Sequence, residues 1–346
     1  MGADENKVPN KIQSNGQKKI KNDVQNTIQI QSFLKNIKSK YILKQIFDNI
    51  EKDKVFKLIN YNKSIQNRLE IGLDDYKNKF LNIIKIEIIP KINCGKGKFI
   101  NYIVDENKYH IYFDEETNER KTNSFSLTNR ASKVKITLYF EESSLKGLFK
   151  DCECIEKINF IRFKRKDIID MSYMFYGCTS LKEVNLSNLI TDNVKDMSFM
   201  FYKCQSLTEL NLSKFNTKEL INMKSIFSRC SALEKIDLSN LDTRNVEDMS
   251  YMFYECYYLN DVNLSKLIVK KLKNVSYMFY GCYSIQELNL ANFDLNSALI
   301  EKKLVFSGCS SLKVFKVKGY YRGDVKDMFK GCSDDLIFNL EYPKEI

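Results

Sequence analysis

The sequence predicts an α/β solenoid, with short parallel strands on a concave side and short helices on a convex side. A 16-residue segment occurs five times between residues 171 and 290, first as MSYMFYGCTSLKEVNL. Its cysteine returns every 26 residues up to Cys282, then after 27 and 23 residues, and the series predicts about eight coils over residues 143–346. A repeat this short cannot bury its apolar face alone, so neighbouring coils must stack and share one core. The series comprises Cys152, Cys178, Cys204, Cys230, Cys256, Cys282, Cys309 and Cys332.

Each copy reads as a helix followed by a strand. In one copy Met197, Phe201 and Cys204 fall at i, i+4 and i+7, which places them on one face of a short helix. Before each helix stands a residue suited to capping its first N–H groups. These residues are Asp170, Asp196, Asn222, Asp248 and Asn274. Leu210 and Leu212 then have the two-residue period of a strand with one buried side.

The motif M-x-x-M-F-x-x-C-x-x-L-x-x-L-x-L resembles the BspA-like form of the leucine-rich repeat. The resemblance covers Ser143 to about Leu340. It implies a leucine-rich repeat fold and a role in adhesion or partner binding without catalysis. Many members of this family are secreted or anchored to a membrane, whereas no such anchor is seen in this sequence.

The first 81 residues are expected to form a disordered tail at 1–24 and a helical module at 25–81. Apolar residues follow helical spacing through the module. Residues 39–69 are similar to an F-box, with Ile46 and Phe47 ending the first short helix, although Ser39-Lys40 replaces the usual opening Leu-Pro. The similarity implies a Skp-type adaptor as partner. A structural helical cap is the alternative.

Residues 82–142 are expected to form a β-rich connector or a cap of the solenoid. Alternating and β-branched residues predict strands at 83–89, 99–103, 109–113 and 134–140. The last of these directly precedes the first coil, so we expect it to cover the edge of the repeats. Leu336, Phe338 and Leu340 are expected to close the other end.

The sequence predicts no enzyme, no cofactor and no metal site. His110 is the single histidine and lies in a strand pattern, which argues against histidine-based catalytic and metal sites. The glycines of Gly95-Lys-Gly97-Lys lack the spacing of a phosphate-binding loop, so a turn is expected there. Cys152-x-Cys154 resembles half a zinc site, but the repeat already uses Cys152.

Charge and cysteine placement bear on partners and location. The net charge is +11, but its lysines are dispersed, so no nucleic acid partner is expected. No apolar run is long enough to span a membrane, and no signal peptide is seen, which predicts a cytoplasmic protein. Helices on the convex side should hold successive repeat cysteines too far apart for disulfides, so the repeat cysteines are expected to be reduced, with nearly all ten cysteines free.

Two surfaces are candidates for partner binding. The first is the outward row of the concave strands. It comprises Glu183, Asn185, Glu209, Asn211, Asp237, Asp261, Asn263, Glu287 and Asn289. When the preceding position of each strand is included, the five central coils hold six acids and two lysines on this face, which disfavours nucleic acid and favours a basic protein partner. A solvated polar face is the open alternative, and the asparagines could form a structural hydrogen-bonded ladder. The second candidate is a tyrosine set on the helices, alternatively explained as filling between helices. It comprises Tyr173, Tyr176, Tyr202, Tyr254 and Tyr280.

The sequence therefore predicts a non-enzymatic scaffold that binds a protein through its repeats. Two alternatives remain open. The first alternative is the substrate-recognition subunit of a ubiquitin ligase, in which residues 39–69 dock an adaptor. The second is a surface adhesin, which applies if the chain shares the location of the family members that it resembles.

Overall fold

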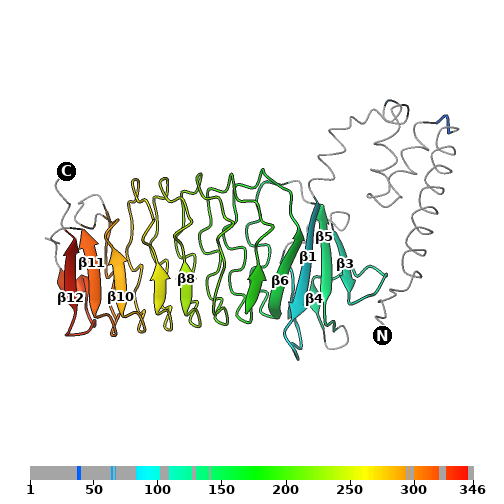
Figure 1. The fold of residues 1–346 in the computed structure, drawn as a ribbon. Coiled ribbons are helices and arrows are strands. Elements are labelled where there is room, and N and C mark those ends of the chain that lie inside the picture. The colour runs from blue at the N-terminus through cyan, green and yellow to red at the C-terminus, as the bar shows by residue number, and fades with distance from the viewer. Residues whose placement is uncertain are drawn as a thin grey trace, which may run out of the picture. The chain divides into compact units, whose positions relative to one another are not determined.

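The computed structural model describes residues 37–39, 64, 67, 83–101, 109–126, 130–139, 142–293, 295, 300–318 and 325–341. The chain divides into two compact units, Met1–Leu81 and Asn82–Ile346. The expected tail and almost all of the helical module, including its F-box-like part, lie outside the described residues. Ser64 and Asn67 are helical, and residues 37–39 have no regular structure. The second unit is a stack of coils that follows a small sheet (Figure 1).

Five strands form the sheet that begins the second unit. They are β1 (Ile83–Pro90), β3 (Tyr109–Phe113), β5 (Val134–Tyr139), β6 (Ile155–Arg162) and β7 (Glu183–Asn185). Their order is β3-β5-β1-β6-β7, with antiparallel pairs up to β6 and the first parallel repeat pair between β6 and β7. Three of the four expected connector strands are therefore confirmed. The strand that covers the first repeat strand is β1, and the expectation that 134–140 does so is wrong, because β5 lies one position further out.

The fourth expected connector strand, at 99–103, is wrong over its described residues. The short strands here are β2 (Gly97–Lys98) and β4 (Ser124–Phe125), which pair with each other. Phe99 and Ile100 follow β2 and are almost fully buried. The Phe99 ring packs against Phe113 and Phe125 at 5.8 and 4.9 Å between centroids. Residue 99 therefore anchors the core of the cap instead of extending a strand.

On the strand side of the coils, the later strands are β8 (Lys235–Asp237), β9 (Asp261–Asn263), β10 (Glu287–Leu290), β11 (Val314–Lys318) and β12 (Ile337–Glu341). They form a β8-β9 pair and a β10-β11-β12 sheet, all parallel. The expected strand at Glu209–Leu212 is absent, although Leu210 and Leu212 are still buried and Glu209 and Asn211 still exposed. The alternation of buried and exposed side chains predicted from the sequence is therefore present here, although the hydrogen bonds of a strand are not. Within the described residues from 83 onward, the one α-helix is α6 (Val325–Met328).

The segments expected to be convex helices are series of tight turns. Tyr176 N–H donates to the carbonyl of Tyr173, three residues back, at 3.0 Å, whereas Phe175 N–H donates to Met200 of the next coil at 2.8 Å. Tyr173 (φ 59°) and Gly177 (φ 72°) also have left-handed backbone, which interrupts an α-helix. A helix of eight residues is too short to be stable alone. In the turn conformation, every second N–H group is available to donate a hydrogen bond to the neighbouring coil.

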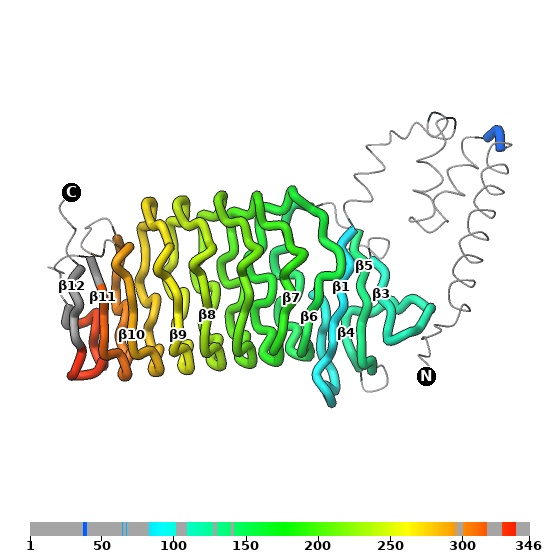
Figure 2. The backbone as a smooth tube through the Cα atoms, in the orientation of Figure 1, coloured from blue at the N-terminus to red at the C-terminus, as the bar shows by residue number. Residues whose placement is uncertain are grey.

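This turn side carries an unbroken ladder between coils. Parallel bridges run through Ser144, Asp170, Asp196, Asn222, Asp248, Asn274 and Glu301. Hydrogen-bonded backbones lie about 4.8 Å apart, against about 8–10 Å for packed helices. The expectation that the helices form a wide convex side is therefore wrong. The expectation of a concave strand side rested on that width, so its physical reason is lost as well. We use "strand face" and "turn side" from here on. Figure 2 shows the coils stacked side by side.

The expected capping role of the residue before each motif is confirmed, although it caps a turn. Asp170 Oδ1 accepts the N–H of Ser172 at 2.8 Å, and Asp196 Oδ1 accepts that of Ser198 at 2.7 Å. The same contact recurs at Asn222, Asp248 and Asn274. Short side chains that bond the backbone two residues on are typical of such turns.

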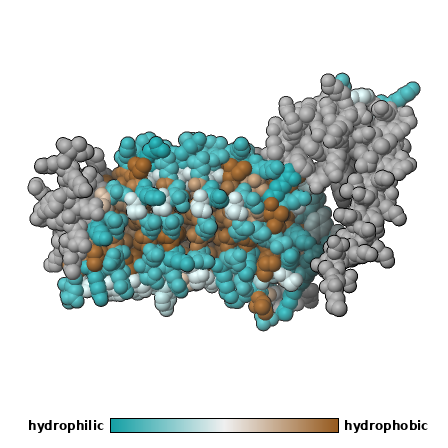
Figure 3. Space-filling model, viewed as in Figure 1, coloured by the Kyte–Doolittle hydropathy of each residue, from teal (hydrophilic) through white to brown (hydrophobic). Residues whose placement is uncertain are grey.

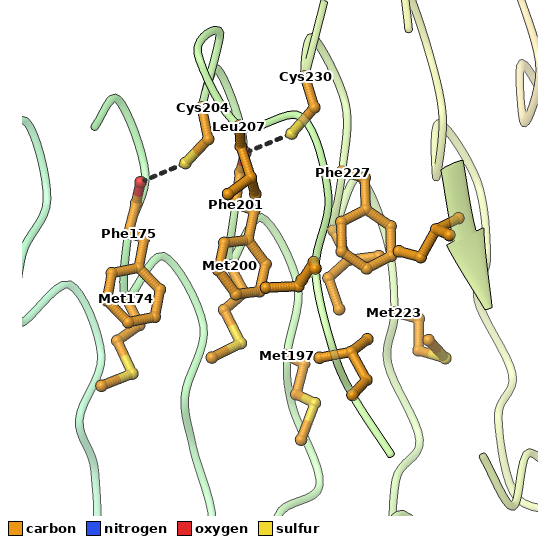
Figure 4. Close-up of a cluster of buried hydrophobic side chains, with 14 of the residues drawn as sticks. Met174, Phe175, Met197, Met200, Phe201, Cys204, Leu207, Met223, Phe227 and Cys230 are labelled. Carbon is orange, nitrogen blue, oxygen red and sulfur yellow. Dashed lines mark hydrogen bonds between the residues drawn. The ribbon is translucent and has the colours of Figure 1, made fainter. Parts of the chain in front are cut away.

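Phenylalanine rings and thiols form the shared core (Figure 4). Phe201 is fully buried and stacks on Phe175 at 5.1 Å and on Phe227 at 5.9 Å. The thiol of Cys230 donates to the Phe201 carbonyl at 3.0 Å. Equivalent side chains meet coil after coil, and Figure 3 accordingly shows rows of hydrophobic and hydrophilic residues running along the stack.

Eight cysteines are free, as expected, but for a different reason. Successive coils are close, and the ladder thiols instead point in register at carbonyls such as that of Phe175, 3.2 Å from Cys204 Sγ. The two cysteines outside this ladder, Cys94 and Cys154, form a disulfide with their Cα atoms 5.6 Å apart, which the sequence did not predict. This bond joins the turn after β1 to the first coil. It also removes Cys154 from any half zinc site.

Candidate interaction surfaces

The strand face presents the outward side chains of the strands along an open groove. Of the row predicted from the sequence, Glu183, Glu209, Asn211, Asp237, Asp261, Asn263 and Asn289 line this groove. Glu287 lines a second hollow beside it, which it shares with Asp261 and Asn289. Asn185 is exposed on β7 but lines neither. The structure therefore brings nearly all of the row together, and most of these side chains reach solvent.

Lysines of neighbouring coils neutralise the first part of the row. Lys157 Nζ lies 2.8 Å from Glu183, and Lys235 Nζ lies 3.2 Å from Glu209. Sequence reasoning missed Lys157, because it considered the five central coils and this residue belongs to the coil before them. Extending the 26-residue register by one coil would have found it.

The amide members of the row are engaged in their own turns. Asn211 Oδ1 accepts the N–H of Ser213 at 2.9 Å, and the same contact recurs at Asn185, Asn263 and Asn289. Asp237 does likewise, and its hydrogen bond from the Ser239 N–H holds the pKa of the Asp237 carboxyl below its usual range. These side chains stabilise the bend after each strand, and Asp237 also has a side-chain hydrogen bond with Asn263 of the next coil.

Asp261 and Glu287 are the acids of the row on which no ion pair or turn contact is seen among the described residues. They occupy the same position on β9 and β10, and both are exposed. Asn260 and Gln286, also exposed, stand immediately before them. Lys316 lines the same hollow. Among the described residues, the acids of the row without a lysine partner are therefore Asp237, Asp261 and Glu287, in its central and C-terminal part.

The aromatic residues of the turn side stack on one another in two rows. Tyr176 stacks on Tyr202 at 4.7 Å, and Tyr254 on Tyr280 at 5.0 Å. The other row holds Tyr173 with Phe199 at 4.8 Å and Tyr251 with Tyr277 at 4.7 Å. Both rows are interrupted at the coil of Cys230, where Ser225 and Ser228 stand instead. The rings are half-buried, so filling between coils accounts for much of their area.

Cations cover the first ring of each stack. Lys150 Nζ lies 5.1 Å from the Tyr176 ring, and the Arg229 guanidinium lies 5.8 Å from the Tyr254 ring. Burial raises the pKa of Tyr254 to about 12 and raises those of Tyr176 and Tyr251. These phenols therefore stay protonated and uncharged at neutral pH.

The other motifs singled out in the sequence have ordinary structural roles. His110 lies in β3, with Nδ1 2.9 Å from the carboxylate of Glu119. The segment from Lys91 to Lys96 is a turn that leads into β2, so Gly95 lies in the expected turn and Gly97 in a short strand. Across the described residues, no group of three or more acidic, histidine or cysteine side chains is placed to hold a metal ion.

Two repeat families match the chain. The family described as "Mycoplasma protein of unknown function, DUF285" matches residues 143–254 and 209–320, together just over half of the chain. The chain is a BspA-like leucine-rich repeat protein of the DUF285 family. The "BspA type Leucine rich repeat region (6 copies)" matches residues 70–192. The resemblance expected from the sequence is thus confirmed, and neither match extends to an F-box.

Solved structures with some similarity are also leucine-rich repeat proteins. One from T. pallidum (TpLRR) is 22% identical, with 51% of this chain and 72% of that chain covered and a TM-score of 0.36. One from Bacteroides ovatus ATCC 8483 is 17% identical, with 70% and 79% covered and a TM-score of 0.22. At these TM-scores neither superposition carries a conclusion about this chain. None of the curated proteins matches it.

Within the part of the chain that the structure describes, no helix is long and apolar enough to cross a membrane.

Proposed function

We propose that this chain is a non-enzymatic repeat protein that holds a basic protein partner on its strand face. The observation that carries the proposal is the groove along the strands, which is lined by exposed charged and amide side chains from successive coils. Stacked repeats offer an extended surface of this kind to a partner. The groove lining contains neither histidine nor cysteine, which favours recognition over catalysis.

The charge pattern narrows the proposed contact to the C-terminal part of the row. Glu183 and Glu209 already have lysine partners within the chain, so a partner gains little from them. Asp261 and Glu287 occupy the same position in successive coils, on β9 and β10, which belong to two separate hydrogen-bonded sheets. Two like charges on neighbouring coils repel by on the order of 1 kcal/mol or less in water and by more as water is excluded. A lysine or arginine of the partner relieves this repulsion and makes its own ion pairs.

A charge-reversal experiment tests the proposal. Asp261→Lys with Glu287→Lys is expected to abolish capture of partners from a lysate of the native cells, while circular dichroism and melting stay unchanged because both side chains are exposed. Glu153→Lys with Glu219→Lys is the matched control, since it changes the net charge equally at exposed sites outside the groove lining. Capture by wild type should also weaken with added salt. Unchanged capture by the first variant would contradict the proposal.

A surface adhesin is a second candidate, favoured by the disulfide. The bond between Cys94 and Cys154 is typical of proteins outside the reducing cytoplasm, in contrast to the cytoplasmic location expected from the sequence. Protease treatment of intact cells tests this candidate: digestion of the chain supports surface exposure, and full protection opposes it. The ubiquitin-ligase alternative depends on residues outside the described part of the chain and stays a sequence prediction.

A further inference from the structure

The coils contain a longer repeat of three coils, or 78 residues. On the strand face, Lys157, Glu183 and Glu209 recur as Lys235, Asp261 and Glu287. On the turn side, Tyr173 recurs as Tyr251 and Tyr176 as Tyr254, in the same stacked arrangement. Residues 171–212 and 249–290 are therefore two versions of one two-coil unit, and each serves as a structural control for the other.

The two versions differ on the turn side at the corner that follows the cysteine. Thr179, Ser180 and Gln205 of the first version are replaced by Tyr257, Tyr258 and Tyr283 in the second. We call these three tyrosines the tyrosine patch. Sequence reasoning missed them, because they occupy variable positions of the repeat motif, directly after its cysteine.

The backbone at this corner is the same with or without the tyrosines. The Ser206 hydroxyl donates to the carbonyl of Thr179 at 2.7 Å, and the Ser284 hydroxyl donates to that of Tyr257 at 2.8 Å. The N–H of residue 205 donates to residue 203 at 2.9 Å, and the N–H of Tyr283 donates to Gly281 at 3.0 Å. The fold therefore does not require tyrosine at these positions.

The tyrosine patch exposes much of its aromatic area. Tyr258 is 64% exposed and Tyr283 is 51% exposed. The rings of Tyr257 and Tyr283 stack at 5.2 Å with 5° between their planes, which fixes a flat pair, and Tyr258 follows Tyr257 directly in the chain. Rigid tyrosines that combine an apolar ring with a hydroxyl are enriched in protein interfaces. Exposed aromatic area that the fold does not need is thus best explained as a contact surface.

We propose that the tyrosine patch binds the same patch of a second copy of this chain, forming a two-fold symmetric dimer. In such a dimer each group meets its own counterpart, so a charged patch would repel itself. Tyrosine is neutral at physiological pH, its hydroxyl both donates and accepts, and its rings pair with one another. The nearest charge on the same coil, Glu255, is already paired with Arg229 at 3.0 Å. The acidic end of the strand face has no such self-complementarity.

The contact is small and the dimer is therefore weak. Three partly exposed tyrosines and their neighbours cover less than the roughly 800 Å² that each partner buries in a standard interface. We expect half of the chains to be dimeric only at a concentration on the order of 100 µM. Because the patch is uncharged, dimerisation should be insensitive to salt, in contrast to the proposed binding on the strand face.

The test is the mass of the full chain by sedimentation equilibrium from about 1 µM to about 1 mM in low and high salt. Wild type is expected to move from monomer to dimer equally in both salts. The variant Tyr257→Thr, Tyr258→Ser, Tyr283→Gln, which installs the residues of the first version, should stay monomeric with unchanged circular dichroism. The single variant Tyr258→Ser keeps the test available if the triple variant folds poorly, and should weaken dimerisation at least several-fold.

A gain-of-function variant gives an independent arm. Thr179→Tyr, Ser180→Tyr, Gln205→Tyr builds a second patch on coils that already share the required backbone, so association beyond a dimer is expected. The proposal is overturned if wild type stays monomeric throughout, which would leave the patch to a different protein. It is also overturned if the folded triple variant dimerises like wild type, or if salt abolishes the dimer.

Discussion

Replacing Phe201 by alanine tests whether the coils share one phenylalanine core. The side chain is fully buried and its ring stacks on Phe175 and Phe227 at 5.1 and 5.9 Å. Emptying such a site lowers the free energy of unfolding by about 3–5 kcal/mol. The upper part of this range is expected, because the Phe201 N–H is hydrogen-bonded to Ile226 of the next coil at 2.9 Å and the backbone cannot collapse into the space.

Urea denaturation followed by circular dichroism measures this loss, with Phe199→Ala as the matched control. Phe199 lies two residues away, is half-buried and stacks on Tyr173, so its removal should lower the free energy of unfolding by only about 1–2 kcal/mol. Repeat proteins can unfold in stages, so both the midpoint and the slope should be compared. A loss below about 1 kcal/mol for Phe201→Ala would refute the shared core.

Three further outcomes are expected. Thiol titration of the unfolded, non-reduced chain should find eight thiols because Cys94 and Cys154 are paired, and a count of ten would disprove the pair. Stability should fall as pH rises from about 8.5 towards 12, because burial raises the pKa of Cys230 to about 12 whereas an unfolded thiol ionises near 8.5. Below that pH range the Cys230 thiol is neutral in both states, so its ionisation does not lower the stability. Cys230→Ala lacks this titrating group, so its urea midpoint should fall less steeply as pH rises. Asn263→Ala should lower the free energy of unfolding by about 0.5–1.5 kcal/mol through loss of its bond to the Ser265 N–H, and a melting temperature equal to wild type would count against that role.

The repeat register and the core were predictable from the sequence, but the turn conformation was not. Apolar residues at i, i+3, i+4 and i+7, such as Met197, Phe201 and Cys204, share one side of a helix, and they share one side of these stacked turns as well. The periodicity therefore identified the buried residues without identifying their hydrogen bonds. Glycine at positions such as Gly177 and Gly281, with φ near 70°, was a signal against helix that the motif contained.

The candidate site was predictable in position and only partly in charge. Side-chain alternation placed Glu209 and Asp261 on the solvent side of their coils, as the structure has them. Lys235 has an acid at the equivalent position of the coil before it, Glu209, and of the coil after it, Asp261. Side-chain geometry decides which of the two it contacts, and Lys235 pairs with Glu209. The link between Cys94 and Cys154 joins residues 60 positions apart, and no local pattern indicates such a contact.

Site-specific photo-crosslinking tests the strand-face assignment most directly. A photoreactive residue in place of Gln286, exposed on the strand face beside Glu287, is compared with one in place of Gln205, exposed on the turn side. In cells that contain the natural partner, a covalent adduct is expected from position 286 and not from position 205, and Asp261→Lys should remove it. Adducts from position 205 alone, or an adduct at 286 that survives Asp261→Lys, would contradict binding at the acidic end of the strand face.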